Sequence, residues 1–303
     1  MGNFRSALKS MRLRTLPLSL AGVSLGILLA ASDYKVSVWT AVLTILTAVC
    51  LQILSNLSNE LGDVLHGTDT DQRQGPRYGL NSGEMTVNQM KALIGGTIVL
   101  CIVSGLLMIR SSFGTIFCFD GICMMMLGAA AISGAMKYTL GRNPYGYRGL
   151  GDVFVFIFFG IVAVLGSYFV VSHTMPMLIL LPAAAIGCFS VGVLNINNIR
   201  DMATDAFNRR TVAIRLGSRN ARIYQTALII IGWALMATFC LMRFFDPWHY
   251  LFVLTLPLFI VHLRGVWTLD GKDLDRMLPL LSLSTLALAL LAGFGFVAFL
   301  IFQ

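Results

Sequence analysis

The chain has 303 residues, of which 57% are hydrophobic and only 12% are charged, and its mean hydropathy is +0.80. A soluble domain needs more charge than this to cover its surface, so the composition excludes an ordinary soluble protein. We therefore expect a single integral membrane domain over residues 1–303, with no separate soluble domain on either side.

Apolar runs of about 20 residues recur along the whole chain, and a run of that length can cross the hydrocarbon core as a helix. The first run follows a basic segment and mimics a signal peptide, but the rest of the chain is equally apolar, so we interpret it as a retained helix. In the fourth run, Asp120 lies inside the outer end and could instead cap a helix that starts at Gly121. Nine spans are predicted, at residues 15–31, 38–58, 91–110, 114–136, 152–172, 176–198, 221–242, 247–264 and 278–301.

The basic residues predict the orientation of these spans. Of the 22 lysines and arginines, only Lys35, Arg110 and Arg243 lie on one side of the predicted membrane, and the others lie on the opposite side. Such an excess is typical of cytoplasmic loops. We therefore expect the N-terminus and the long polar loops to be cytoplasmic and the C-terminus to face outward.

Two polar clusters follow predicted spans on the cytoplasmic side. In the first, Asn59 and Asp63 are four residues apart and share one face of a helix, while Asp69 and Asp71 follow Gly67 on a predicted turn. In the second, a stripe of polar residues recurs every four positions at the end of the sixth span. Its members are Asn197, Asp201 and Asp205.

This pattern of residue types is suited to magnesium and diphosphate. Magnesium binds oxygen ligands and often combines one or two carboxylates with phosphate oxygens. Such ions could neutralise a diphosphate and stabilise it as a leaving group. Arginines close to the clusters in sequence would add charge-assisted contacts to phosphate oxygens. They are Arg73 and Arg77 beside the first cluster, and Arg200, Arg209, Arg210 and Arg215 beside the second.

A third cytoplasmic loop, residues 137–152, combines tyrosines with arginines and glycines. It suits an aromatic anionic substrate through stacking and cation–π contacts, although an interfacial aromatic belt would have a similar composition. Other acids are interpreted as helix caps or solvated charges, namely Asp33, Asp246, Asp270, Asp273 and Asp275. Glu60 points about 100° away from Asn59 on an ideal helix and is left out of the metal set.

Several stretches together resemble one family. They are Arg14-Thr-Leu-Pro17, the run from Leu51 through Asp63 to Asp69, Gly75-Pro-Arg77, Tyr145 to Asp152, Phe158-Phe-Gly160, Leu194 to Asp201, and Arg215-Leu-Gly217. The chain resembles the UbiA superfamily of intramembrane aromatic prenyltransferases, and in particular the branch that acts on 1,4-dihydroxy-2-naphthoate. The resemblance implies nine transmembrane helices around a central cavity, in a bacterial inner membrane.

It further implies magnesium-dependent transfer of a polyprenyl chain from polyprenyl diphosphate to 1,4-dihydroxy-2-naphthoate, with loss of carbon dioxide. Membrane lipid is the expected surrounding, and no nucleic acid partner is implied. The implied metal ligands are Asn59, Asp63, Asp69, Asp201 and Asp205. Implied substrate contacts are Asn59, Arg77, Arg142, Tyr147, Asp152, Asn197, Arg209 and Arg215. Lys137 would draw charge off the diphosphate, and Tyr138 and Asp152 are candidate proton acceptors.

The chain departs from the family pattern at one position. The first motif usually has a third acidic residue where this chain has Gly67, and the nearest acid is Asp69. Other aromatic acceptors, such as 4-hydroxybenzoate or homogentisate, remain open alternatives. A transporter is a further alternative, but transporters place charge near the membrane midplane, and here the acids gather on one surface.

Overall fold

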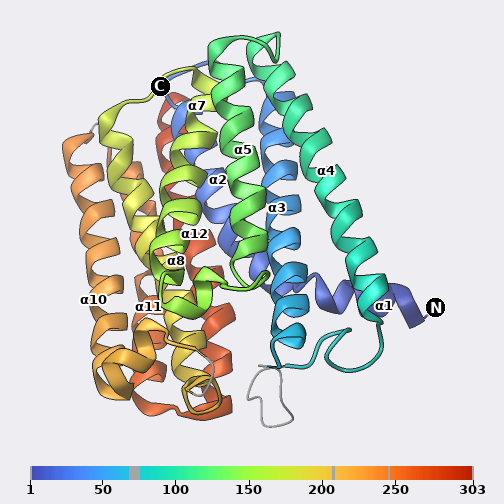
Figure 1. The fold of residues 1–303 in the computed structure, drawn as a ribbon. Helices are drawn as coiled ribbons and strands as arrows, with labels where there is room; N and C mark the ends of the chain where they lie inside the picture. Colours follow the sequence, from blue (N-terminus) through green and yellow to red (C-terminus); the bar gives the residue numbers. More distant parts are fainter. Residues whose placement is uncertain (1, 68–75, 207–208, 245, 302–303) are drawn as a thin grey trace.

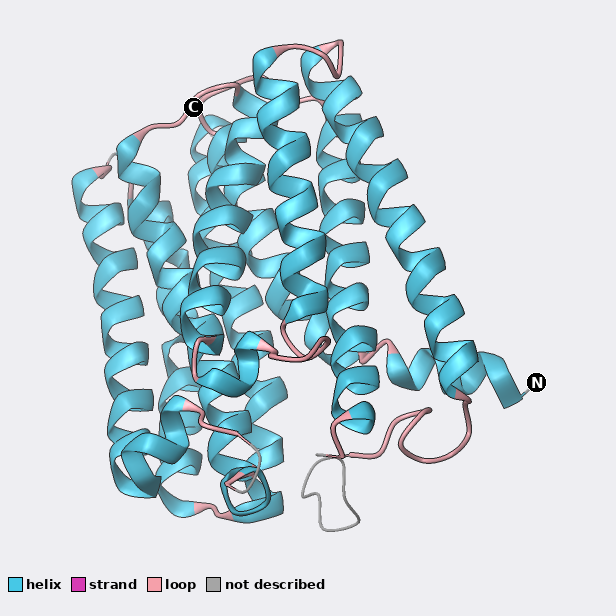
Figure 2. Ribbon diagram, in the orientation of Figure 1, coloured by secondary structure: helices cyan, strands magenta, loops and turns pink. Residues whose placement is uncertain are grey.

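The computed structural model of the chain describes residues 2–67, 76–206, 209–244 and 246–301, and within these ranges every regular element is a helix (Figure 1, Figure 2). The elements are α1 (Gly2–Ser10), η1 (Leu13–Thr15), α2 (Leu16–Ala31), α3 (Val38–Leu65), α4 (Val87–Phe113), α5 (Phe119–Lys137), η2 (Tyr145–Arg148), α6 (Gly151–Val155), η3 (Phe156–Gly166), α7 (Ser167–Ser172), η4 (Met177–Ile179), α8 (Leu180–Arg200), α9 (Met202–Asp205), α10 (Val212–Met242), η5 (Pro247–Thr255), α11 (Leu256–Thr268), η6 (Gly271–Arg276) and α12 (Met277–Ile301).

Nine helical segments among the described residues are long and apolar enough to cross a membrane. They are Phe4–Ala31, Val38–Leu65, Val87–Phe113, Phe119–Lys137, Gly151–Ser172, Met177–Arg200, Val212–Met242, Pro247–Thr268 and Gly271–Ala298. The first segment combines most of α1 with α2, although Figure 1 shows α1 lying across the end of the bundle. The predicted all-helical fold with nine spans is confirmed.

Several helix boundaries differ from the predicted ones, and two of them concern polar residues singled out in the sequence. The helix predicted over 38–58 continues to Leu65, so Asn59 and Asp63 lie on α3 itself. The helix predicted to start at 114 starts at Phe119, because the Cys118 side chain accepts a hydrogen bond from the Gly121 backbone N–H. Capping by Cys118 leaves Asp120 in the first turn of α5, so the alternative that Asp120 itself caps this helix is wrong.

Small residues allow the central helices to approach closely. α8 packs against α10, α12 and η3, and most of its residues are buried. A Cβ atom added to Gly160 of η3 would lie 2.5 Å from the Gly187 Cα and 2.7 Å from the Ala183 carbonyl oxygen of α8. Helices in lipid gain little hydrophobic free energy from packing together, so such close backbone contact is a main source of their association.

The stretch η3 is a π-helix of 11 residues inside the fifth span. A π-helix is rare and is frequently found at functional sites. Here Phe158, Phe159, Val162 and Ala163 all line the internal cavity described below.

We predict that Gly160→Ala lowers the free energy of unfolding by about 1–3 kcal/mol, because the backbone atoms of α8 cannot move away from the new methyl group. Thermal denaturation of the protein in detergent micelles measures this effect. Gly96→Ala on α4 is the matched control, because a Cβ atom there has no neighbour within 4 Å. Equal stability of the two variants would contradict the assigned role of the α8–η3 contact.

Candidate active site

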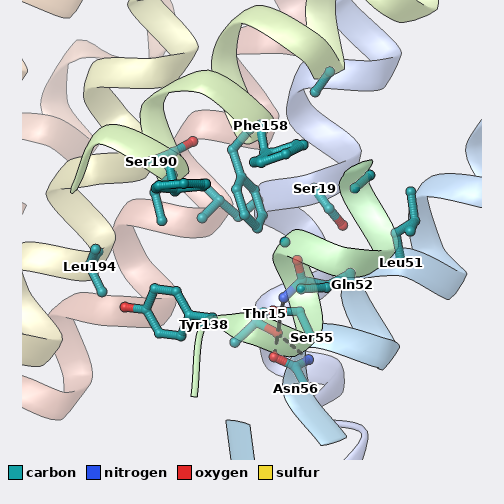
Figure 3. Close-up of a pocket in the computed structure, with 18 of the residues that line it drawn as sticks. Thr15, Ser19, Leu51, Gln52, Ser55, Asn56, Tyr138, Phe158, Ser190 and Leu194 are labelled. Carbon is teal, nitrogen blue, oxygen red and sulfur yellow. Dashed lines mark hydrogen bonds between the residues drawn. The ribbon is translucent and has the colours of Figure 1, made fainter. Parts of the chain in front are cut away.

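A cavity of about 370 Å³ lies inside the bundle between α2, α3, α5, η3 and α8 (Figure 3). Its lining is polar where α3 and α8 end, and we call this part the polar end of the cavity. Much of the remaining lining is apolar and includes Val23, Met108, Met124, Phe158 and Val170. The cavity can therefore accommodate a molecule with a charged head and a hydrocarbon tail.

The last turns of α3 supply one wall of the polar end. Asn59 and Asp63 both line the cavity, and Asp63 is 6% exposed. The Thr139 hydroxyl lies 2.9 Å from the Ser58 carbonyl oxygen and 3.2 Å from the Asn59 side-chain oxygen. Thr139 lies in the segment that follows α5, and its hydroxyl therefore fixes the position of Asn59.

The end of α8 supplies the opposite acids. α8 ends at Arg200, and α9 begins at Met202. Backbone hydrogen bonds from Asp201 N–H to Asn197 (3.1 Å) and from Asp205 N–H to Asp201 (2.9 Å) maintain the helical spacing across this break. Asn197, Asp201 and Asp205 therefore all line the cavity as one stripe.

Arg209 joins the two acidic walls. Its Nη2 donates to Asp63 Oδ1 at 2.5 Å, and its Nη1 lies 3.7 Å from Asp205 Oδ2. Tyr147 donates from its hydroxyl to the same Asp63 oxygen at 2.8 Å, and the Arg209 guanidinium carbon lies 4.5 Å from the Tyr147 ring centre. Burial opposes the charge of Arg209, but Asp63 and Asp205 outweigh burial and raise the pKa of Arg209.

A second arginine holds Asp201. Arg200 is buried and donates from Nε to Asp201 Oδ1 at 2.8 Å and from Nη2 to Asp201 Oδ2 at 2.5 Å, which is a bidentate pair. Its Nη2 also donates to Asn197 Oδ1 at 2.9 Å, and its Nη1 donates to Asp275.

The interpretation of Asp275 as a cap or a solvated charge is wrong. Asp275 lies on η6 and accepts hydrogen bonds from both Arg200 and Arg14, the latter at 2.9 Å. Arg14 also donates to the Tyr78 hydroxyl at 2.8 Å. Asp275 therefore connects the N-terminal segment and the loop before α4 with the acids at the end of α8.

The candidate site residues of the 137–152 loop have different surroundings. Tyr138 lines the cavity, and burial raises the pKa of its hydroxyl further above neutral pH, which makes the group a poorer proton acceptor by loss of its proton. Lys137 and Arg142 are exposed and do not line the cavity. Asp152 is buried outside the cavity lining and accepts a hydrogen bond from Tyr224 at 3.0 Å.

Two further predicted site residues lie outside the cavity lining. Arg77 and Arg215 are exposed, and Arg215 donates to the Arg148 carbonyl oxygen at 3.0 Å. Glu60 is fully buried and accepts from the Leu80 backbone N–H at 2.6 Å, so it holds the loop before α4. Asp69 lies outside the described residues.

The polar end offers the ligand types that magnesium prefers. No group of three or more histidine, cysteine, aspartate or glutamate side chains in the described ranges is placed to hold a metal ion unaided. The candidate ligands are carboxylate and amide oxygens on two walls, and each carboxylate is paired with an arginine. Hard oxygen donors of this kind fit a magnesium ion whose coordination is completed by phosphate oxygens.

Sequence reasoning missed one part of this wall. Gln52 and Asn56 also line the cavity, directly above Asn59 and Asp63 on α3. Their spacing of four, three and four residues places all four side chains on one helix face. This spacing was visible in the sequence, and it extends the polar stripe almost two turns further into the membrane span.

Comparison with known proteins places the chain among membrane prenyltransferases. The model of the UbiA prenyltransferase family matches residues 19–286. A 1,4-dihydroxy-2-naphthoate octaprenyltransferase from Escherichia coli is 39% identical over 96% of this chain and 93% of that protein. A protein of the same name from Haemophilus influenzae is 34% identical over 94% of this chain and 93% of that protein.

A solved structure shares the fold. The structure of a UbiA homolog from Archaeoglobus fulgidus bound to GPP and Mg²⁺ matches with a TM-score of 0.64 over 97% of this chain and 99% of that one, at 15% identity. The nine membrane spans, the internal cavity and the match over most of the chain agree with one another, and the chain belongs to the UbiA prenyltransferase family.

Proposed function

We propose that this protein transfers a polyprenyl group from a polyprenyl diphosphate to 1,4-dihydroxy-2-naphthoate, with loss of the carboxylate as carbon dioxide. The observation that carries the proposal is the polar end of the cavity, where Asp63 and Asp205 from two helix ends meet at Arg209. The names of the relatives from Escherichia coli and Haemophilus influenzae support the naphthoate acceptor.

We assign the diphosphate to the polar end together with magnesium. Asn59, Asp63, Asp201 and Asp205 would hold the metal, and Asp69 remains a proposed fifth ligand. Bound there, magnesium would neutralise the diphosphate and stabilise it as a leaving group. The solved homolog with bound GPP and Mg²⁺ supports a magnesium requirement in the family.

Arg209 and Tyr138 would act directly on the diphosphate head. Arg209 is the buried cation between the acidic walls, and it would form charge-assisted hydrogen bonds to phosphate oxygens. The Tyr138 hydroxyl, whose pKa burial raises further above neutral pH, would donate a hydrogen bond in the same region. Both contacts gain strength as negative charge moves onto the departing diphosphate.

The apolar part of the cavity suits the polyprenyl chain and the reacting carbon. Cleavage of the allylic C–O bond leaves a carbocation, which water would capture. Apolar side chains of η3 and α8 that line the cavity would keep water away from this carbon. The electron-rich naphthoate ring forms the new C–C bond, the diphosphate takes the electron pair of the broken C–O bond, and decarboxylation returns an electron pair to the ring.

The charge distribution supports an orientation for the reaction. Nineteen of the 22 lysines and arginines lie on the side of the polar end by the predicted topology, which is typical of the cytoplasmic side. We therefore propose that the cavity opens toward the cytoplasm from a bacterial inner membrane.

Purified protein is expected to form prenylated, decarboxylated naphthoquinol from 1,4-dihydroxy-2-naphthoate and a polyprenyl diphosphate. Mass spectrometry identifies the product, and release of ¹³C-labelled carbon dioxide from the labelled carboxylate follows the decarboxylation. Parallel assays with 4-hydroxybenzoate and homogentisate test the alternative acceptors. Product from one of these, and none from the naphthoate, would reject the proposed acceptor.

Asp63→Asn is expected to lower turnover by at least about 100-fold, because it removes a charged oxygen from the proposed metal site. Removal of divalent metal with a chelator should stop turnover of the unmodified protein, and added Mg²⁺ should restore it. Asp273→Asn is the control, because Asp273 is exposed and pairs with Arg276 at the surface. Near-normal turnover of the folded Asp63 variant would reject the metal assignment.

Asp275→Asn is expected to raise the Mg²⁺ concentration for half-maximal activity by about tenfold, equivalent to about 1.4 kcal/mol. Without Asp275, the positive charge of Arg200 is balanced by Asp201 alone, so Asp201 attracts a divalent cation less strongly. Titration with Mn²⁺ followed by electron paramagnetic resonance measures the same change as a binding constant. Asp273→Asn, on the same short helix, should match the unmodified protein. The same metal dependence in both variants would contradict this role of Asp275.

A further inference from the structure

A buried polar network continues the stripe of α3 above the acids. Gln52 and Asn56 are 7% and 4% exposed, and both line the cavity inside the membrane span. Figure 3 shows the Gln52 side chain reaching from α3 toward the middle of the pocket, above Thr15 and Asn56. Polar groups at this depth are costly unless they are paired or used.

Two backbone carbonyls determine the direction of every hydrogen bond in this network. The Asn56 amide nitrogen lies 2.8 Å from the Met11 carbonyl oxygen, which can only accept. The Thr15 hydroxyl lies 2.9 Å from the Arg12 carbonyl oxygen, so the hydroxyl must donate there. The Thr15 oxygen can then only accept from the side chains of α3.

The remaining contacts follow from these two. Asn56 donates its second N–H to the Thr15 oxygen at 2.9 Å. Gln52 donates one N–H to the Thr15 oxygen at 3.1 Å and the other to the Asn56 side-chain oxygen at 3.2 Å. Both amide groups have then used all their donors, and neither amide can be turned around without losing these bonds.

One acceptor is left over. The Gln52 Oε1 atom is buried and has no hydrogen-bond partner among the described residues. A buried acceptor without a partner costs free energy, so a partner that brings a donor is expected. Because the network fixes the amide, the ligand side of this contact must be an O–H or N–H group.

We propose that Gln52 Oε1 accepts a hydrogen bond from a ring hydroxyl of the aromatic acceptor and so orients the ring above the diphosphate. This inference rests on the proposed function. Of the two proposed substrates, the ionised polyprenyl diphosphate has only acceptor oxygens and hydrocarbon. The two ring hydroxyls of the dihydroxynaphthoate are the only donors, so the chemistry of the substrates selects the naphthoate as the partner.

The assignment also separates the two substrates along α3. The anionic diphosphate belongs with Arg209 and the metal ligands at the end of the helix. Gln52 stands 11 residues before Asp63, at a rise of about 1.5 Å per residue, which places the two about 16 Å apart along the helix axis. Between them lie Asn56 and Asn59 on the same face, so the ring would lie on the hydrocarbon side of the diphosphate.

The test measures acceptor binding without prenyl diphosphate, so turnover is not needed. Isothermal titration of the full chain in nanodiscs, kept anaerobic, compares 1,4-dihydroxy-2-naphthoate with 1-hydroxy-2-naphthoate and 4-hydroxy-2-naphthoate. The unmodified protein is expected to bind the dihydroxy compound about tenfold more tightly than one of the two analogues. Gln52→Met, which keeps the side-chain length and loses the acceptor, is expected to remove this preference.

A further variant controls for damage to the fold. Gln225→Met removes a buried glutamine that lies outside the cavity lining, and it should keep the tenfold preference. The comparison of the analogues on the unmodified protein tests the same contact even if Gln52→Met does not fold.

Specific outcomes would overturn the inference. If Gln52→Met retains the full preference, or if the unmodified protein has none, Gln52 does not hold the hydroxyl and the inference is wrong. In either case the product assay with dihydroxynaphthoate still decides the proposed function separately. Prenylated naphthoate formed by a protein without the binding preference would reject the Gln52 contact and leave the reaction standing.

Discussion

Carboxylates next to hydrocarbon must be paired with cations, and the site of this protein is built around that requirement. Asp63 and Asp205 share Arg209, and Asp201 holds Arg200 in a bidentate pair. Breaking such a buried pair by removing one partner leaves an uncompensated charge, so each arginine is as constrained as the acid it meets. A magnesium diphosphate would enter a site whose charges are already nearly balanced.

The helix bundle makes this pairing possible by bringing chain ends together. Arg200 and Asp201 end α8, Asp63 lies in the last turn of α3, and Asp275 comes from the short helix before α12. The close contact of Gly160 with the backbone of α8 holds η3 against the helix that carries the acids. The π-helical turn of η3 then directs Phe158 and its neighbours into the cavity.

Prediction from the sequence succeeded where residues lie on consecutive turns of helical backbone. The 3.6-residue period relates Asn59 to Asp63 and Asn197 to Asp205 whatever the rest of the fold, and all four line the cavity. It failed for Asp275, whose role depends on Arg14 and Arg200, at separations of 261 and 75 residues. The same helical period could have placed Gln52 on the polar face of α3. The sequence could not show that its side-chain oxygen lacks a hydrogen-bond partner, because that depends on contacts with other segments.

The amino-acid sequence by itself determined the membrane class, the number of spans and the two polar stripes, because hydrophobic length and helical period are local properties. Tertiary structure alone decided which stripe residues meet, that Arg209 joins Asp63 to Asp205, and that Lys137 and Arg142 remain at the surface. It also decided the orientation of the Gln52 amide, through the carbonyl groups of Met11 and Arg12. Contacts between distant segments depend on how whole helices pack, and a local sequence pattern does not predict that packing.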